Sequence, residues 1–277
     1  RSRGLGDVYK RQRLDDHVRG TTLGGTGLSN PMKALTGIEK MALKAEKISS
    51  GYIVNGSLPW VSHIREGGYC GVIASVPDKA DHEIMFLLDL DERAQLKECP
   101  KFSGMEGTST WAIELRDYFV NEDQVIADPV RPFIKRVRPA FVLLQTGFGL
   151  GVTQGAIDSM IEVEDALGHV NQFLHDRPSE LQPELDRLKT KVHELGSDIF
   201  SGSAEMLVDV LDVRAQVSEL SLRATQSALL HQGARGYLMS SPVQRRIREA
   251  HFVAIVTPAI KHLRWEMSKL MKADLAA

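Results

Sequence analysis

The chain has 277 residues, of which 43% are hydrophobic and 25% charged, which is ordinary for a soluble globular protein and long enough for two domains. Its net charge of -2 gives no long-range attraction for nucleic acids or anionic membranes. We find no apolar run that approaches the roughly 20 residues needed to span a bilayer, and two cysteines are too few for a disulfide framework. These features predict a soluble protein of the reducing cytoplasm, with no nucleic-acid partner and no membrane insertion.

The first twelve residues, RSRGLGDVYKRQ, show neither helical nor strand periodicity, and the chain starts without a methionine. They look like a scar left by a sequencing adapter or by cloning, and such segments are excluded from fold reasoning. We therefore expect the folded part to begin at Arg13 and the natural protein to continue upstream.

Residues 13–127 alternate short β-rich runs with turn residues. The runs at 69–76, 83–90 and 110–120 are rich in β-branched and aromatic residues, which favour strands. Asn55-Gly56 predicts a tight hairpin turn, because this dipeptide readily adopts positive φ. The region predicts an antiparallel, barrel-like β-domain.

Residues 128–139 carry three prolines among basic residues, and proline cannot continue a helix interior. We interpret this segment as a linker, with Arg136 and Arg138 as solvated charges. Beyond it, apolar residues recur every three or four positions, as in long amphipathic helices. Residues 140–277 therefore predict an up-down helical bundle, so that the whole chain has an α+β fold.

Three further features need a structural explanation. Thr257-Pro258 predicts a break between two helices, with threonine as N-cap and proline at the first helical position. Gly147, Gly149 and Gly151 lack the third glycine of the dinucleotide fingerprint, so we expect close helix packing there instead. The nine histidines have no ligand spacing and predict no metal site.

Several segments, in fixed order, resemble motifs of the acyl-CoA dehydrogenase and oxidase family. GLSNP at 27–31 is similar to ALTEP, GYIVNG at 51–56 to GYxLNG, WVS at 60–62 to W-I-T/S, GARGY at 233–237 to GGxGY, and REA at 248–250 to R-D-A. The resemblance covers nearly everything after residue 12. It implies a divergent member whose N-terminal α-domain is missing, with a β-domain followed by the helical bundle.

The resemblance also implies FAD as the cofactor. Trp60 would pack beside the flavin and Ser62 would approach the isoalloxazine, because an indole covers a flat ring and a hydroxyl can donate to a ring nitrogen. Leu28 and Ser29, in the segment that opens the β-domain, would contact the cofactor as well. Arg235 is interpreted either as a phosphate contact or as a turn residue.

The chain departs from the family at the catalytic base. Counting from the REA segment, the usual position of the catalytic glutamate falls on Thr257, and the alternative position falls near Phe141. Neither side chain can remove an α-proton from a thioester. The motifs for the cofactor's diphosphate are weak as well, so the catalytic residue stays unassigned.

Three functions are compatible with this pattern. The first is a divergent FAD-dependent oxidoreductase acting on an acyl-CoA or related thioester, with an unknown electron acceptor. The second is a flavin monooxygenase of the same fold, which needs no α-proton base, and the third is a catalytically inactive scaffold. A homodimer or homotetramer is expected from the resemblance.

Overall fold

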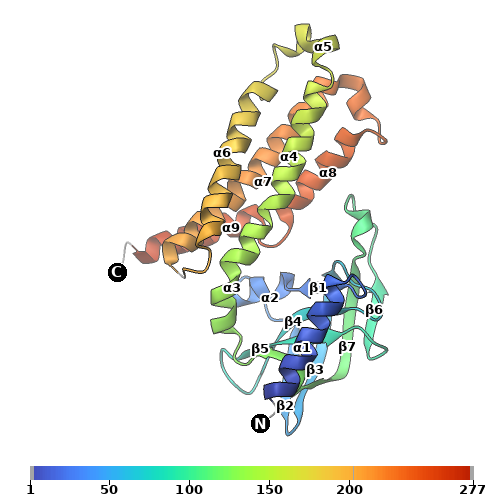
Figure 1. Ribbon diagram of the computed structural model, residues 1–277, viewed down its shortest axis with the longest axis vertical. Coiled ribbons are helices and arrows are strands. Elements are labelled where there is room, and N and C mark those ends of the chain that lie inside the picture. Colours follow the sequence, from blue (N-terminus) through green and yellow to red (C-terminus); the bar gives the residue numbers. More distant parts are fainter. Residues whose placement is uncertain (1–2, 202, 275–277) are drawn as a thin grey trace. The chain divides into compact units, whose positions relative to one another are not determined.

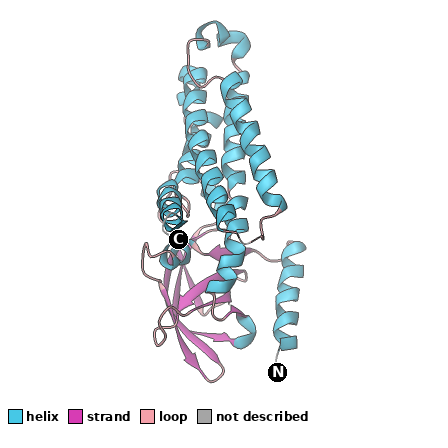
Figure 2. Cartoon of the chain, turned by 90° about the vertical axis from the view of Figure 1, so that its left-hand side faces the viewer, coloured by secondary structure: helices cyan, strands magenta, loops and turns pink. Residues whose placement is uncertain are grey.

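The computed structural model describes residues 3–201 and 203–274 and contains two compact units (Figure 1). Unit 1 comprises the described residues up to Phe102 together with Glu106–Ile134, and unit 2 comprises Ser103–Met105 with the described residues from Lys135 onward. Strands gather in unit 1 and long helices in unit 2 (Figure 2). The predicted α+β class is confirmed.

Unit 1 contains an eight-stranded sheet in the order β6-β7-β3-β2-β4-β5-β8, with β1 paired to β4. The strands are β1 Gly24–Gly27, β2 Leu43–Ile48, β3 Gly51–Val61, β4 Tyr69–Ser75, β5 Glu83–Asp89, β6 Ala94–Glu98, β7 Trp111–Asn121 and β8 Val125–Ala127. The β1–β4 and β2–β4 pairings are parallel, and the predicted antiparallel arrangement holds for the other pairs. Apolar side chains from both long strands, β3 and β7, fill its core.

Asn55-Gly56 does not form the predicted hairpin turn. It lies inside β3, where the register with β7 shifts between Val54 and Gly56. Gly56 has φ 133°, and a Cβ there would lie 2.3 Å from the carbonyl oxygen of Ala42. The Asn55 side chain is bound by Asp117, whose backbone N–H donates to Asn55 Oδ1 over 2.8 Å. The dipeptide's positive-φ tendency is thus used for a bulge.

The N-terminal segment forms α1, Arg3–Val18, so regular structure begins before Arg13, where we expected the folded part to begin. Positions 1 and 2 lie outside the described residues. Lys10 Nζ donates to the carbonyl oxygen of Val125 over 2.7 Å, and Arg13 Nη2 lies 2.6 Å from Asp89 Oδ1. The sequence of α1 has little periodicity, but two of its side chains bind groups of the β-domain.

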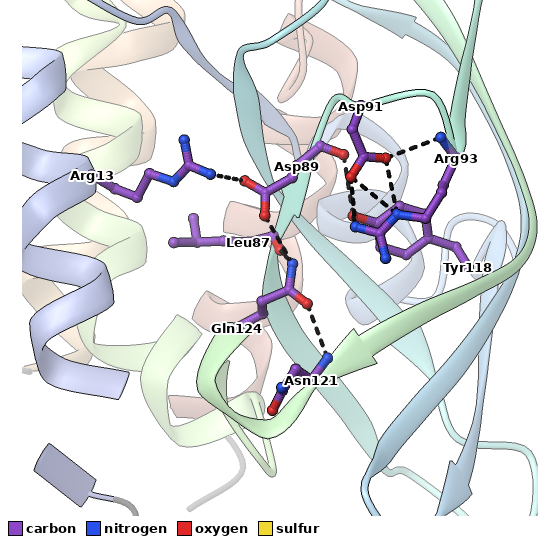
Figure 3. Close-up of polar contacts among 8 residues, drawn as sticks. All are labelled: Arg13, Leu87, Asp89, Asp91, Arg93, Tyr118, Asn121 and Gln124. Atoms are coloured by element: carbon purple, nitrogen blue, oxygen red, sulfur yellow. Dashed lines mark hydrogen bonds and ion pairs between the residues drawn. The ribbon is translucent and has the colours of Figure 1, made fainter. Parts of the chain in front are cut away.

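Asp89 is the centre of the polar network that holds this edge of unit 1 (Figure 3). Its carboxylate accepts from Arg13 on one side and from Gln124 Nε2, over 3.1 Å, on the other. Its carbonyl oxygen accepts from the Tyr118 hydroxyl over 3.2 Å, and Gln124 Oε1 accepts from the Asn121 backbone N–H over 2.9 Å. The polar atoms named here thus have their hydrogen-bond partners within unit 1.

The proline-rich segment is a helix and not an extended linker. Residues Arg131–Leu144 form α3, with Pro139 inside it, and the division between the units falls after Ile134. An interior proline removes a hydrogen bond and costs about 3 kcal/mol. Burial of Pro139, Val142 and Leu143 offsets that cost. The proline-rich composition therefore predicted a linker where the structure has a helix.

Unit 2 is the predicted bundle, with α4, α6, α7 and α8 lying side by side (Figure 1). Its helices are α4 Thr146–Ile161, α5 Glu164–Asn171, α6 Pro178–Ser197, α7 Ala204–Gln232, α8 Pro242–Ile255 and α9 Ile260–Asp274. A Cβ on Gly149 would lie 2.5 Å from Val217 Cγ1, so this glycine lets α4 approach α7 closely, as expected. Gly147 and Gly151 have nothing within 4 Å of a Cβ and do not have that role.

The stretch Arg131–Ile161, which covers α3 and α4, is long and apolar enough by length and composition alone to cross a membrane. The expectation that no apolar run is long enough is corrected by this finding. Within its most apolar 18-residue window, 39% is buried inside the protein, and core helices of soluble proteins pass the same test.

Candidate functional site

Trp60 and Ser62 stand at the end of β3, on the same side of the chain. The intervening Val61 is buried, whereas Trp60 is 61% exposed and Ser62 is exposed, as strand alternation requires. The register between β3 and β7 shifts between Leu58 and Val61, just before this pair. The irregular end of β3 therefore presents an indole and a hydroxyl together.

A row of three hydroxyls lies beside Trp60, and we call Ser62, Thr108 and Thr110 the hydroxyl cluster. Ser62 Oγ lies 2.7 Å from Thr110 Oγ1, which lies 3.0 Å from Thr108 Oγ1, and either oxygen of each pair can donate. The backbone N–H of His63 donates to the Thr108 carbonyl oxygen over 2.8 Å. The main chains of the two segments are thus tied together, which fixes the position of the hydroxyls.

Phe102 extends the aromatic surface. Its ring meets the Trp60 ring edge-on, with centroids 5.9 Å apart and planes at 89°. Edge-to-face pairs of this kind are favourable and hold both rings in place. The Trp60 indole is therefore oriented while most of it remains open to solvent.

The chain before α2 (Ser29–Leu35) packs against the same strand end. A Cβ on Gly25 would lie 2.7 Å from the carbonyl oxygen of Ser62, so only glycine permits this approach. Ser29 is exposed at the start of α2, but Leu28 is only 6% exposed and its side chain belongs to the core. Only main-chain groups of Leu28 can therefore reach a ligand, which narrows its expected role.

Arg235 belongs to unit 2 and is exposed on a 3-10 turn, Gly233–Tyr237. Gly233 has φ 59° and ends α7, so the first glycine of the GARGY segment has a structural role. Unit 1 by itself therefore holds four of the five candidate cofactor residues. The assignment of Arg235 to a phosphate contact stays a prediction.

The predicted break at Thr257-Pro258 is confirmed, because α8 ends at Ile255 and α9 begins at Ile260. Thr257 and Pro258 lie in the connection itself, so neither has the expected capping role. The Thr257 carbonyl oxygen accepts from Gln145 Nε2 over 3.1 Å. Sequence reasoning missed Gln145, since nothing local signals a contact across 112 positions.

Neither position expected for a catalytic carboxylate is acidic in the folded unit. Thr257 lies in the α8–α9 connection, and Phe141, on α3, is partly buried against the bundle core. Arg138, expected to be solvated, instead forms an ion pair with Glu266 in which the two side chains are 16% and 12% exposed. Arg138 is therefore ion-paired and largely buried, and is not a solvated charge as expected.

Comparisons with known proteins agree on one family. Residues 198–257 match the model of the acyl-CoA dehydrogenase C-terminal domain. The chain is 24% identical over 264 residues to the mitochondrial isovaleryl-CoA dehydrogenase of Arabidopsis thaliana, which covers 90% of this chain and 63% of that protein. The chain is thus similar to the acyl-CoA dehydrogenase family, with the match to the family model lying in residues 198–257.

Solved structures of this family share the fold. Butyryl-CoA dehydrogenase from Megasphaera elsdenii superposes with a TM-score of 0.80 at 18% identity, covering 98% of this chain and 72% of that one. An acyl-CoA dehydrogenase from Geobacillus kaustophilus gives a TM-score of 0.81 at 15% identity, covering 97% and 72%. The acyl-CoA dehydrogenase fold is thereby shown, although this chain spans only 63% of the length of its Arabidopsis relative.

Proposed function

We propose that this acyl-CoA dehydrogenase family member binds FAD at the Trp60 surface of unit 1 and is an oxidoreductase acting on an acyl-CoA or related thioester. The observation that supports it is the exposed, oriented indole beside the hydroxyl cluster. A planar ring system with hydrogen-bond acceptors on one edge fits such a surface.

The residues of unit 1 would have distinct roles. Trp60 would cover one face of the flavin ring, with Phe102 holding the indole in place. Ser62 would donate to a ring acceptor, because its partner Thr110 can in turn donate to Ser62 Oγ and Thr108 can supply the next hydrogen. When bound, FAD supplies the two-electron redox chemistry that no side chain of this chain offers.

The proton step separates two reactions. The Thr257 hydroxyl is not basic enough to take an α-proton, and Phe141 has no titratable group. An ordinary dehydrogenation would therefore need a base from a part of the protein other than these two positions. A flavin monooxygenase needs no such base, so the absence of carboxylates at 141 and 257 favours it as the second candidate.

The first test is the visible absorbance of the protein after incubation with FAD and desalting. We expect flavin bands to be retained, and Trp60→Ala to weaken FAD binding by about 5- to 30-fold, from loss of about 1–2 kcal/mol of ring contact. Trp265→Ala is the matched control, since Trp265 is 36% exposed on α9 of unit 2 and should leave binding unchanged. A colourless wild-type protein would refute the proposal and favour the inactive scaffold.

Oxygen then distinguishes the two reactions. Reduction of bound flavin by an acyl-CoA without oxygen supports the dehydrogenase. Oxygen-dependent consumption of reduced flavin with a hydroxylated product supports the monooxygenase. We further propose a homo-oligomer, as is usual in the family, to be checked by light scattering, while the cytoplasmic location stays a prediction because the Arabidopsis relative is named mitochondrial.

A further inference from the structure

The outward side of α9 gathers three lysines around a tryptophan. At about 100° per residue, the helix places Lys261, Trp265, Lys269 and Lys272 within an arc of about 80° around its axis. All four residues are exposed, and for the large indole of Trp265 the exposed fraction is 36%. We call these four residues the lysine face of α9.

The opposite side of α9 fixes the direction of the lysine face. Leu263 is fully buried, and Met267 and Leu270 pack against the core of the bundle. These three positions lie about 180° to 240° from Lys261 around the helix. Because the apolar side holds α9 against the bundle, the helix cannot turn to cover its lysines.

Ion pairs border the lysine face but do not use its charges. On one side of it, Arg264 pairs with Glu219 of α7, and on the other side Glu266 pairs with Arg138 of α3. The three lysines of the face have no carboxylate partner among the described residues. Three positive charges therefore point to solvent without local neutralisation.

The tryptophan of the lysine face is in contact with one of these charges. Lys269 Nζ lies 3.6 Å from the centroid of the Trp265 ring, which is a favourable cation–π arrangement. An aromatic ring and an ammonium group thus lie side by side at the surface. Such a pair can contact an apolar layer and an anionic layer at the same time.

We propose that the lysine face binds the surface of an anionic phospholipid membrane. The ammonium groups of the lysines would lie against the charged headgroups, and Trp265 would enter the interfacial layer, where indole rings are enriched. No segment would cross the bilayer. The net charge of the chain is -2, so the attraction is local and is screened by salt.

A membrane fits the lysine face better than an acidic protein does. Lysine is depleted at protein–protein interfaces, whereas arginine is enriched there. Lysine is a point charge on a flexible stem, which can follow headgroups as they move in the plane of the membrane. The arginine beside the face, Arg264, is already paired within the bundle. The charges that remain are all of the kind that suits a fluid surface.

The test is cosedimentation of the whole chain with vesicles of phosphatidylserine and phosphatidylcholine, with pure phosphatidylcholine vesicles as the reference. We expect binding to the mixed vesicles at low salt and its loss at high salt. The combined variant Lys261→Gln, Lys269→Gln and Lys272→Gln should bind about 100-fold more weakly, which is about fivefold for each lysine. Arginine at the same three positions keeps the charge and should retain the binding.

The matched control removes the same charge elsewhere. Lys40, Lys44 and Lys79 are exposed lysines of unit 1. The combined variant Lys40→Gln, Lys44→Gln and Lys79→Gln should change the binding by less than about threefold, because charges away from the contact are screened. Equal losses in the two glutamine variants would show that only net charge matters and would overturn the inference.

Tryptophan fluorescence tests the role of the indole. Binding of the wild type to the mixed vesicles should shift its emission to shorter wavelength, as the indole leaves water. Trp265→Phe should lose this shift, since the other two tryptophans, Trp60 and Trp111, belong to unit 1. A shift that survives in this variant would overturn the assignment of Trp265 to the contact.

Circular dichroism establishes that each variant is folded. If the combined glutamine variant of α9 fails to fold, its three single variants provide the same comparison. A wild type that binds the mixed vesicles no better than pure phosphatidylcholine would overturn the inference. Vesicle binding is scored without FAD or a thioester, so such a failure leaves the proposed function standing.

Discussion

The two units differ in the buried titratable groups whose pKa values are strongly shifted. In unit 1 these groups are neutral acids: burial raises the pKa of Cys70 from 9.0 to about 12 and that of Tyr118 to about 12, and burial together with Asp128 raises the pKa of Tyr52. In unit 2 burial lowers the pKa of a base, Arg214, to about 10. Burying a neutral thiol or phenol costs little free energy, whereas burying a charged guanidinium costs more. The desolvation cost of Arg214 therefore falls on unit 2.

Arg214 is 0% exposed on α7, and no carboxylate among the described residues pairs with it. Its Nη1 donates to Ser218 Oγ and its Nη2 donates to the Val253 carbonyl oxygen over 2.9 Å. Val253 lies in the last turn of α8, where the helix dipole is negative and carbonyls lack helical partners. A helix end thus takes the place of a counter-ion.

The largest expected effect comes from removing this arginine. Arg214→Ala should lower the free energy of unfolding by about 3–5 kcal/mol, because it leaves a large cavity and an unsatisfied helix end. Arg214→Met fills similar space without a charge to desolvate and should stay within about 1 kcal/mol of the wild type. Denaturant unfolding measures both. Equal losses would mean that the guanidinium bonds matter more than volume and desolvation.

Close approach of helices is a second feature of unit 2. Gly149→Ala should lower the free energy of unfolding by about 1–3 kcal/mol, because its Cβ would meet Val217 Cγ1 at 2.5 Å and the Val217 carbonyl oxygen at 3.1 Å. Gly151→Ala, on the exposed side of the same helix, should instead raise it by about 0.5–1 kcal/mol. Thermal unfolding of the two variants should therefore shift in opposite directions. Shifts of the same sign would rule out the packing explanation.

Alkaline pH should have opposite effects on the stabilising contributions of Cys70 in unit 1 and Arg214 in unit 2. The unfolded chain loses the Cys70 proton near pH 9, whereas the folded chain keeps it until about pH 12, so stability present below pH 9 is lost as pH rises. Arg214 acts oppositely: the folded chain loses its proton first, from about pH 10, which relieves a burial cost. Between pH 8 and 10 the wild type should lose about 1 kcal/mol more than Cys70→Ala.

Denaturant unfolding, followed by near-ultraviolet circular dichroism at pH 8 and pH 10, gives the free energy of unfolding of both proteins. Equal pH dependence of this free energy in the wild type and Cys70→Ala would contradict the Cys70 contribution. The tyrosines are unchanged in the variant, so their own titration cancels in the comparison.

The smallest effect is expected on the surface of unit 2. Glu219 and Arg264 form an ion pair with side chains 38% and 61% exposed. Glu219→Gln should change the free energy of unfolding by less than about 0.5 kcal/mol, since exposed pairs are screened by solvent. Thermal unfolding at low and high salt checks this, and a loss above about 1 kcal/mol would show that charge in unit 2 matters beyond Arg214.

Much of the fold was predictable. The β-branched and aromatic composition of residues 69–76 and 83–90 predicted the strands β4 and β5. The period of three to four beyond residue 140 predicted the helices, because side-chain periodicity reports which face is buried. Trp60 and Ser62 were proposed from their motif, and both are exposed, which is compatible with a cofactor surface, so their role stays a prediction. Leu28 was found through its motif as well, but packing places its side chain in the core.

The errors share one cause, which is that tertiary contacts overrode local preference. Asn55-Gly56 favours a turn, yet pairing with β7 draws it into a strand as a bulge. Pro139 disfavours a helix interior, yet the buried side of α3 stabilises one. Residues 3–12 lack periodicity, yet α1 forms where Lys10 and Arg13 find acceptors on the β-domain.

By itself, the sequence determined the order of a β-rich and a helical region, the family motifs, and the lack of a carboxylate at positions 141 and 257. The tertiary structure decided which helix end receives Arg214, which loop binds Gln145, and which hydroxyls line up beside Trp60. Periodicity is a local property that a short window of residues carries. Hydrogen bonds between positions 39, 48 or 112 residues apart depend instead on how whole elements pack, and no local pattern records them.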